Sequence, residues 1–223
     1  MPIIKKPTLG LALSGSGNRT TFYIGFLDVL RQAGVQIDYI SACSGGSVVA
    51  AAFACGHWAE FKNMALTLDK DDMNNFFIRG KERGGLYSLD RFEEEMLKFT
   101  GGMTFEEVRP LMAFVAVDIE TGELVNLLMG DIAKAARISC TLPFVFEPVK
   151  WGGKTLVDGG LLSYIPLEPL RLAGIDITIG INMRGTKHIF NDRILTAKKI
   201  LNAVKKYLLI DNLENLINDL LSN

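Results

Sequence analysis

Residues 35–46 read Val-Gln-Ile-Asp-Tyr-Ile-Ser-Ala-Cys-Ser-Gly-Gly, and this stretch decides the fold. Apolar and polar residues alternate over residues 35–40, which predicts a strand. Gly45 and Gly46 then open a run of small, mostly apolar residues that predicts a helix through residue 54. The chain is therefore expected to turn sharply from strand to helix at Ser44.

The residues before this stretch repeat the pattern of strand, loop and helix. Residues 8–13 form a short apolar run that predicts a strand, and a glycine-rich loop at residues 14–17 closes it. Apolar residues then recur at helical spacing until Gly34 ends the helix. Strands that alternate with helices indicate a parallel sheet covered on both faces, with the ligand at the carboxyl ends of the strands. We expect an α/β fold in three layers, α/β/α, around a mostly parallel central sheet.

The rest of the chain is expected to complete a single domain over residues 1–223. The polar residues 69–85, with charge clusters and paired glycines, predict a long loop or lid. Thr104 and Glu107 have the spacing of a capping box, which predicts the start of a helix. A motif-bearing core would cover about residues 8–182, followed by amphipathic C-terminal helices over residues 193–223. The remaining predicted elements are a helix after Ser88, strands 111–117 and 124–128, a hairpin of 149–151 with 155–157, a helix at 166–172 and a strand at 175–181.

Composition excludes several classes of function. The 223 residues carry 24 Lys and Arg against 25 Asp and Glu, a formal net charge of −1, so no nucleic-acid partner is expected. Cys43, Cys55 and Cys140 lack paired spacing, so we expect no disulfide framework and no structural metal. We also expect no cofactor. The N-terminus has no secretory signal pattern, and the longest apolar run is too short to span a bilayer. We expect a cytoplasmic protein whose C-terminal helices could make peripheral contact with a membrane. The alternative is that the apolar faces of these helices pack on the protein's own core.

Ser44 is the first candidate for chemistry. Residues 42–46 have the form of a nucleophile elbow, in which small residues let strand and helix pass closely and leave the serine hydroxyl exposed. The dipole of the helix that begins at Gly45 would stabilise an oxyanion formed at Ser44. The alternative is a helix N-cap serine without a catalytic role.

Two further loops with glycines follow predicted strands. Residues 15–20 read Gly-Ser-Gly-Asn-Arg-Thr, and their amides could converge on a phosphate or an oxyanion, although a plain strand-to-helix turn is the alternative. Asp158 ends a strand before two glycines and could deprotonate a nearby serine hydroxyl. The alternative for Asp158 is a turn aspartate that bonds its own backbone.

His57 and His188 are the only histidines. The order Ser44, Asp158, His188 matches that of a hydrolase triad. However, His188 falls in a polar stretch that predicts an exposed loop, and His57 comes just after the helix that follows Ser44. We therefore favour neither histidine as a general base.

The three loops, in this order, resemble the patatin-like phospholipase family over about residues 9–181. The family's G-G-G-x-R-G loop aligns with residues 15–20, its G-x-S-x-G elbow with residues 42–46, and its D-G-[GA] motif with residues 158–160. The resemblance implies a Ser–Asp dyad that needs neither histidine nor metal, with Ser44 as nucleophile and Asp158 as general base. It also implies an oxyanion hole at Gly15, Ser16, Gly17, Asn18 and Arg19, and supporting positions at Ala42, Gly45, Gly46, Gly159 and Gly160.

The chain departs from the family pattern at three glycine positions, which are Ser16, Thr20 and Ala42. A β-branched Thr20 is unfavourable at positive φ, so either the turn is looser here or this residue already lies in the helix. Ser16 keeps its amide but narrows the oxyanion pocket. These changes bear on efficiency and substrate range more than on the fold.

The leading hypothesis is a serine acyl hydrolase that cleaves carboxylic esters of lipids, including phospholipids, through an acyl-enzyme. Leu142, Phe144 and Phe146 are expected beside the acyl chain, and the compact chain suggests an open site that prefers short acyl esters. One alternative is a weak or inactive lipid-binding protein on the same scaffold. The other is a nucleotide-binding module whose residues 15–17 hold a phosphate.

Overall fold

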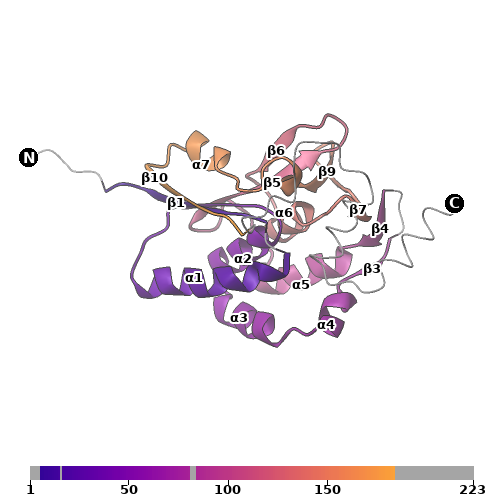
Figure 1. Ribbon diagram of the computed structural model, residues 1–223, viewed down its shortest axis with the longest axis horizontal. Coiled ribbons are helices and arrows are strands. Elements are labelled where there is room, and N and C mark those ends of the chain that lie inside the picture. The colour runs from indigo at the N-terminus through magenta and orange to yellow at the C-terminus, as the bar shows by residue number, and fades with distance from the viewer. Residues whose placement is uncertain (1–5, 16, 81–83, 184–223) are drawn as a thin grey trace, which may run out of the picture. The chain divides into compact units, whose positions relative to one another are not determined.

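The computed structural model describes residues 6–15, 17–80 and 84–183, which belong to one compact unit that ends at Met183. A seven-stranded sheet forms the centre of this unit (Figure 1). The predicted C-terminal helices over residues 193–223 lie outside the described residues, and so does His188.

The central sheet has a parallel half and an antiparallel half. Its strand order is β10-β1-β2-β5-β9-β8, and β6 also pairs with β5. The α/β fold with a central sheet is confirmed, and its antiparallel share is larger than the sequence indicated. The parallel strands are β10 (Ile177–Ile181), β1 (Leu9–Leu13), β2 (Tyr39–Ala42) and β5 (Leu111–Asp118). The antiparallel strands are β6 (Leu124–Leu127), β9 (Lys154–Asp158) and β8 (Val149–Trp151).

Helices cover both faces of the sheet, which gives the three layers visible in Figure 1. On one face, Leu170 of α7 (Glu168–Leu172) packs against Ala12, Tyr39 and Ala113. The opposite face carries the larger hydrophobic core, which includes Leu11, Ile40 and Phe114 of the strands. The helices of that layer are α1 (Thr21–Gln32), α2 (Gly45–Ala54), α3 (Trp58–Thr67), α5 (Asp90–Thr100) and α6 (Ile132–Ser139).

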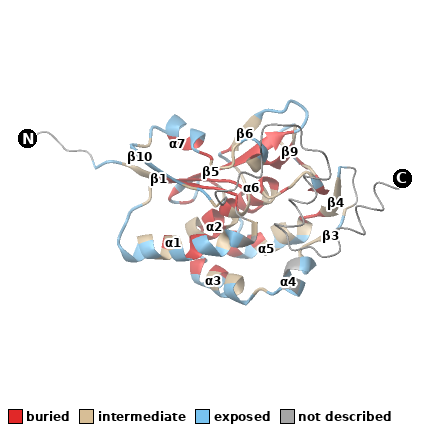
Figure 2. Cartoon of the chain, in the orientation of Figure 1, coloured by how far each residue is buried: buried red, intermediate tan, exposed pale blue. Residues whose placement is uncertain are grey.

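Helix α2 lies inside this core, as the buried residues near the middle of Figure 2 show. Val49, Ala50, Ala51 and Ala52 are all fully buried. A helix that is apolar on nearly all sides is typically buried between other secondary-structure elements. Its small side chains allow the neighbouring elements to come close. Packing on all sides therefore fixes the position of the residues at the start of α2.

Residues 69–85 are not the long loop that we expected. They contain α4 (Lys70–Asn75), β3 (Ile78–Arg79) and the first residue of β4 (Gly85–Ser88). β3, β4 and β7 (Phe144–Phe146) form a second, three-stranded sheet. A Cβ on Gly85 would lie 2.2 Å from the backbone nitrogen of Glu147, so this glycine allows two strands to approach closely. The paired glycines that predicted a loop have a packing role.

The predicted capping box forms its hydrogen bonds, but no helix follows it. The Glu107 carboxylate accepts hydrogen bonds from the Thr104 amide at 2.8 Å and from the Thr104 hydroxyl at 3.0 Å. Residues 104–110 form turns that lead into β5. Pro110 has no N–H to donate to a helical hydrogen bond, and it also disfavours helical backbone at the residue before it. The capping signal was correct locally, and the predicted helix was wrong.

Strand β2 begins at Tyr39, four residues later than predicted, and it continues to Ala42. Asp38 lies just before it, and its carboxylate accepts the Leu9 amide at 2.8 Å. The Asp38 side chain thus holds the start of β1, and Asp38 itself is not part of β2. The strand also ends two residues later than predicted, at Ala42, directly before Cys43.

Candidate active site

Ser44 lies in a strained turn between β2 and α2. Its backbone has φ 49° and ψ −129°, and such positive φ values are rare for residues other than glycine. A Cβ on Gly46 would lie 2.7 Å from the Leu13 carbonyl oxygen and 2.9 Å from that of Ser14. Only glycine therefore allows the start of α2 to pass this close to the end of β1.

The Ser44 side chain makes no capping hydrogen bond, although Ser44 occupies the N-cap position of α2. The N-cap role would direct its hydroxyl to an amide of the first helical turn. The backbone of Ser44 is held instead by Ser139, whose hydroxyl accepts the Ser44 amide at 2.9 Å and donates to the Val115 carbonyl at 2.8 Å. The Ser44 hydroxyl is thus not used to cap the helix.

Asp158 reaches Ser44 because β2 and β9 end at the same place on β5. Ala42 at the end of β2 is in register with Phe114, and Asp158 at the end of β9 is in register with Ala116. β2 runs parallel to β5 and β9 runs antiparallel to it, so their carboxyl ends converge. As a result, the Cys43 sulfur lies 3.6 Å from Oδ1 of Asp158.

The Asp158 carboxyl group is buried, with 6% of the residue exposed. Burial raises its pKa from 3.8 to about 6, while hydrogen bonds from Ser44, Gly160 and Cys43 act in the opposite direction. The Gly160 amide donates to Oδ1 at 2.8 Å, so Asp158 also makes the local backbone bond of a turn aspartate. A carboxylate with a pKa near neutrality that faces a serine hydroxyl has the properties of a general base.

Gly159 fits only as glycine, since an added Cβ would lie 2.5 Å from the backbone carbon and oxygen of Val115. A short 3-10 turn, η2 (Gly159–Leu161), follows directly after Asp158. The close approach to β5 fixes the direction in which the chain leaves Asp158. This accounts for the first glycine of the predicted motif.

The glycine loop after β1 also lies against Ser44. A Cβ on Gly15 would lie 3.4 Å from the Ser44 Cβ, so the two backbones are close. The Gly15 amide, however, donates to the Tyr164 carbonyl at 3.3 Å, so it already has a partner. Gly17 has φ 52° and begins the 3-10 turn η1 (Gly17–Thr20), whose Thr20 is helical with φ −53°. Thr20 therefore lies in the helix, which was one of the two possibilities for this departure.

The other predicted oxyanion residues differ in what the structure describes. The Arg19 guanidinium donates to the Met183 carbonyl at 2.7 Å, so it ties the loop to the segment that follows β10. Ser16 lies outside the described residues, and so does the side chain of Asn18. Among the predicted oxyanion residues, the structure thus brings Gly15 next to Ser44.

His57 lies apart from the predicted dyad. It occupies the N-cap position of α3, and a Cβ on Gly101 would lie 3.8 Å from its Nε2 atom. His57 does not contribute to the pKa shift of Asp158. This agrees with the expectation that His57 is not the base.

Sequence reasoning assigned no role to two side chains of this site, Ser139 and Cys43. Ser139 holds the Ser44 amide, and it lies in the Ser-Cys-Thr-Leu-Pro stretch at residues 139–143. Cys43 occupies the variable position of the elbow, where the motif itself gives no signal. Of the three predicted acyl-chain residues, Phe144 is exposed, Leu142 is half-buried and Phe146 is buried.

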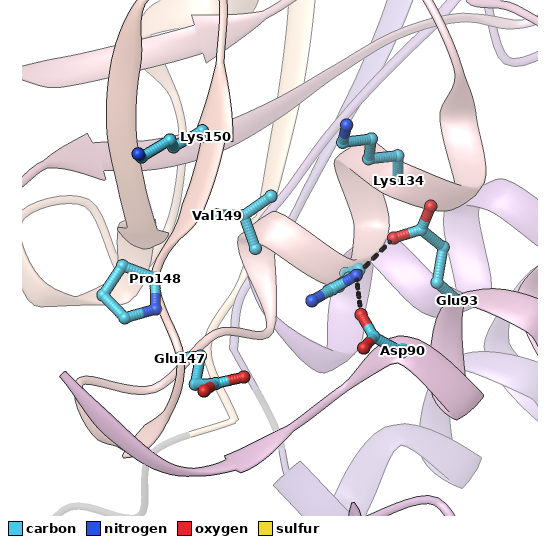
Figure 3. Close-up of a pocket in the computed structure, with 8 residues that line it drawn as sticks. Asp90, Glu93, Lys134, Glu147, Pro148, Val149 and Lys150 are labelled. Carbon is cyan, nitrogen blue, oxygen red and sulfur yellow. Dashed lines mark hydrogen bonds and ion pairs between the residues drawn. The ribbon is translucent and has the colours of Figure 1, made fainter. Parts of the chain in front are cut away.

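A separate cavity of about 300 Å³ lies between α5, α6 and the segment at residues 147–150 (Figure 3). Its lining is charged, and neither Ser44 nor Asp158 belongs to it. The Arg137 guanidinium at its wall forms ion pairs with Asp90 at 2.5 Å and Glu93 at 2.8 Å. Because Arg137 pairs with two of the carboxylates in its lining, we interpret this cavity as a structural crevice.

Within residues 6–15, 17–80 and 84–183, no three His, Cys, Asp or Glu side chains gather in a way that could bind a metal ion. In the same part of the chain, no helix is both long enough and apolar enough to cross a membrane.

Sequence comparisons identify several similar proteins. An uncharacterized NTE family protein of Mycobacterium tuberculosis is 28% identical over 181 residues, which cover 81% of this chain and 50% of that protein. The lysophospholipase NTE1 of Cryptococcus neoformans is 27% identical over 184 residues, which cover 75% of this chain and 10% of that protein. The chain therefore spans half the length or less of these relatives.

A structural comparison and a family model agree on the class of fold. The crystal structure of VipD from Legionella pneumophila has a TM-score of 0.50 and 14% sequence identity, over 72% of this chain and 47% of that chain. This likeness concerns the fold alone. The model of the patatin-like phospholipase family matches residues 11–171, which include the glycine loop, the Ser44 elbow and the Asp158 turn. The chain therefore belongs to the patatin-like phospholipase family.

Proposed function

We propose that this chain is a serine acyl hydrolase that cleaves carboxylic esters of lipids, with Ser44 as nucleophile and Asp158 as general base. The observation that carries the proposal is the Ser44 hydroxyl, which does not cap its helix and acts on the buried carboxyl of Asp158 as a donor that lowers its pKa. Nucleophile and base within hydrogen-bonding reach are the arrangement that covalent acyl transfer requires.

In the first half of the reaction, the Ser44 hydroxyl loses its proton to Asp158 as its oxygen attacks the ester carbonyl carbon. The tetrahedral intermediate then collapses, the carbon–oxygen bond to the alcohol breaks, and Asp158 returns the proton to the leaving oxygen. In the second half, Asp158 takes a proton from water, the water oxygen attacks the acyl-enzyme, and the Ser44 oxygen leaves with the proton. The products are the alcohol or lysolipid and the fatty acid.

The oxyanion of the tetrahedral intermediate needs donors near Ser44. The N-terminus of α2 directs its dipole at this position, which supports the stabilisation predicted for the helix that begins at Gly45. The predicted oxyanion loop is the second source, with Gly15 in contact with Ser44. Because the Gly15 amide already bonds Tyr164, we expect the amides of Ser16 and Gly17 to be the main donors of that loop.

A lipid ester is the substrate class that the family membership supports best. The name of the Cryptococcus neoformans relative describes a lysophospholipase, and we extend that class of substrate to this chain. Exposed apolar side chains flank the site in sequence: Leu161 and Leu162 follow the Asp158 turn, and Phe144 follows the Ser139 segment. They support peripheral contact with a lipid surface, and we keep the preference for short acyl esters and the cytoplasmic location as parts of this proposal.

The test is hydrolysis of p-nitrophenyl esters of increasing chain length, with a chelator present throughout. We expect turnover by the wild type and a loss of at least about 10³-fold in Ser44→Ala and Asp158→Asn. His57→Ala is the control, because His57 lies at the start of α3, and it should keep turnover within about twofold of the wild type.

The outcomes separate this proposal from its alternatives. A fluorophosphonate probe should label the wild type and leave Ser44→Ala unlabelled. A wild type that hydrolyses no ester and takes up no probe contradicts the proposal, and lipid binding without turnover then identifies the inactive scaffold. A rise in Tm on addition of nucleotide, with no such rise on addition of lipid, identifies the nucleotide-binding module.

A further inference from the structure

The Cys43 thiol lies where the three loops of the candidate active site meet. It is fully buried, and its sulfur is 3.6 Å from Oδ1 of Asp158. A Cβ on Gly160 would lie 3.2 Å from the sulfur, so the turn after Asp158 packs directly against the thiol. On the other side, the backbone of Gly15 lies near the sulfur, and its amide slightly opposes the rise in the pKa of Cys43.

The thiol is a hydrogen-bond donor in this position. Burial, followed by the neighbouring Asp158 carboxyl, raises the pKa of Cys43 well above its usual value, so the sulfur keeps its proton. A protonated thiol next to a carboxylate oxygen donates to it. Oδ1 of Asp158 therefore receives two donors, the Cys43 thiol and the Gly160 amide at 2.8 Å.

These two donors have a consequence for the base. A carboxylate whose one oxygen is occupied by fixed donors cannot rotate freely, so its orientation toward Ser44 is maintained. Donors to the charged form also favour ionisation, which opposes the effect of burial on Asp158. The titratable groups that face this cluster are the Cys140 thiol, which is near both Asp158 and Cys43, and Tyr23, which is near Cys43. Tyr164 lies next to Tyr23 and against Gly15.

We propose that Cys43 is a positioning residue for the general base: its thiol, held between the Gly15 loop and the Gly160 turn, donates to Oδ1 of Asp158 and keeps that carboxylate ionised and directed at Ser44. The inference rests on the proposed function, since it concerns the same dyad. It extends that function to the variable position of the elbow, because the residue before the nucleophile affects the base.

The test is the pH profile of kcat/KM for p-nitrophenyl ester hydrolysis. The acidic limb of this profile reports the ionisation of the base in the free enzyme. We expect Cys43→Ala to move this limb upward by about half a pH unit, which is about a threefold loss below the limb. Cys43→Ser retains a donor, because the stronger hydroxyl compensates for its shorter reach, and it should restore the wild-type limb.

Two further variants make the test specific. Cys55→Ala is the matched control, since Cys55 is also buried, at 3% exposure, and is absent from the contacts of Asp158, so its profile should not move. Gly160→Ala breaks the same contact from the other side, because its Cβ would lie 3.1 Å from Oδ1 and 3.2 Å from the Cys43 sulfur. It should move the limb upward as Cys43→Ala does.

Failure of this inference can be told from failure of the proposed function. Superimposable profiles for the wild type, Cys43→Ala and Gly160→Ala, with Ser44→Ala and Asp158→Asn inactive, overturn the positioning role and leave the dyad in place. An equal shift in Cys55→Ala also overturns it, because the effect would then be one of stability. Wild-type turnover that survives Asp158→Asn overturns both proposals.

Discussion

Ser44 and Asp158 lie side by side, but the chain builds their surroundings by different means. Around Ser44 the backbone determines the geometry, through the positive φ of the elbow and the close approach of Gly46 to the end of β1. Around Asp158 the environment determines the chemistry, through burial that raises its pKa to about 6. The proposed nucleophile is therefore expected to be sensitive to steric changes, and the proposed base to changes in polarity and in hydrogen-bond donors.

The largest effect is expected from adding a methyl group near Ser44, where close backbone contacts determine the geometry. Gly46→Ala places a Cβ within 3.0 Å of two backbone carbonyl oxygens, which cannot move without shifting β1. We expect a loss of about 3 kcal/mol in the free energy of unfolding, measured by urea denaturation. Gly25→Ala is the control, because nothing lies within 4 Å of its added Cβ in the middle of α1. The control should gain about 0.5 kcal/mol, and equal losses in both variants would contradict the steric account.

On the polar side, Asp158→Asn should change how stability depends on pH. The folded-state pKa of about 6 lies above the unfolded value of 3.8, so the folded protein binds more protons between these values. Wild-type stability therefore falls as the pH rises through this window, by about 2 to 3 kcal/mol in total, and Asp158→Asn removes this dependence. Urea denaturation from pH 4 to pH 7 measures the difference between the two proteins. If the difference in unfolding free energy between the two proteins stays constant over this pH range, folding does not raise the pKa of Asp158.

A smaller effect is expected at Ser139, which holds the backbone of Ser44. Ser139→Ala leaves the Ser44 amide and the Val115 carbonyl without this partner, which should cost about 1 to 2 kcal/mol of stability. Because the elbow loses its support, we also expect kcat for ester hydrolysis to fall about tenfold. Ser41→Ala is the control: Ser41 is equally buried and bonds the Pro166 carbonyl, so it should lose similar stability and keep its activity. Full activity in Ser139→Ala would show that the elbow holds its shape without this bond.

The smallest effect concerns the strain at Ser44 itself. Ser44→Gly can adopt φ 49° without steric cost, so we expect the free energy of unfolding to rise by about 1 kcal/mol and Tm by about 2 to 4 °C. Ser44→Ala retains a Cβ and its strain, so its Tm should stay close to that of the wild type. Both variants should be inactive under the proposed function, so calorimetry is the measurement. A lower Tm for Ser44→Gly than for Ser44→Ala would mean that the turn is unstrained.

The two sides of the site also differ in how far the sequence predicts them. Ser44 and Asp158 could be found because each follows a short strand and precedes glycines, and both signals are local. The fold class followed from the same alternation of strands and helices. Cys43 and Ser139 could not be assigned roles, because their importance arises from contacts with residues distant in sequence, at Asp158 and Val115.

Local signals misled where tertiary packing decides the outcome. The glycines at residues 80–85 have the composition of a loop, but a close approach to residues 146–147 places them in and beside a sheet. The bond between Thr104 and Glu107 forms as predicted, and Pro110 then prevents a helix. Helices α3 and α6 were not predicted from the sequence.

The register of β2 and β9 on β5 has a consequence for the folding of the protein. Cys43 and Asp158 are 115 residues apart in sequence, and their contact requires both strands to dock on the same central strand. Contacts between such distant residues carry a large loop-closure entropy and form slowly. Ester hydrolysis would therefore recover late in refolding, after the helical signal in circular dichroism. Turnover thus serves as a kinetic reporter of long-range assembly in this chain.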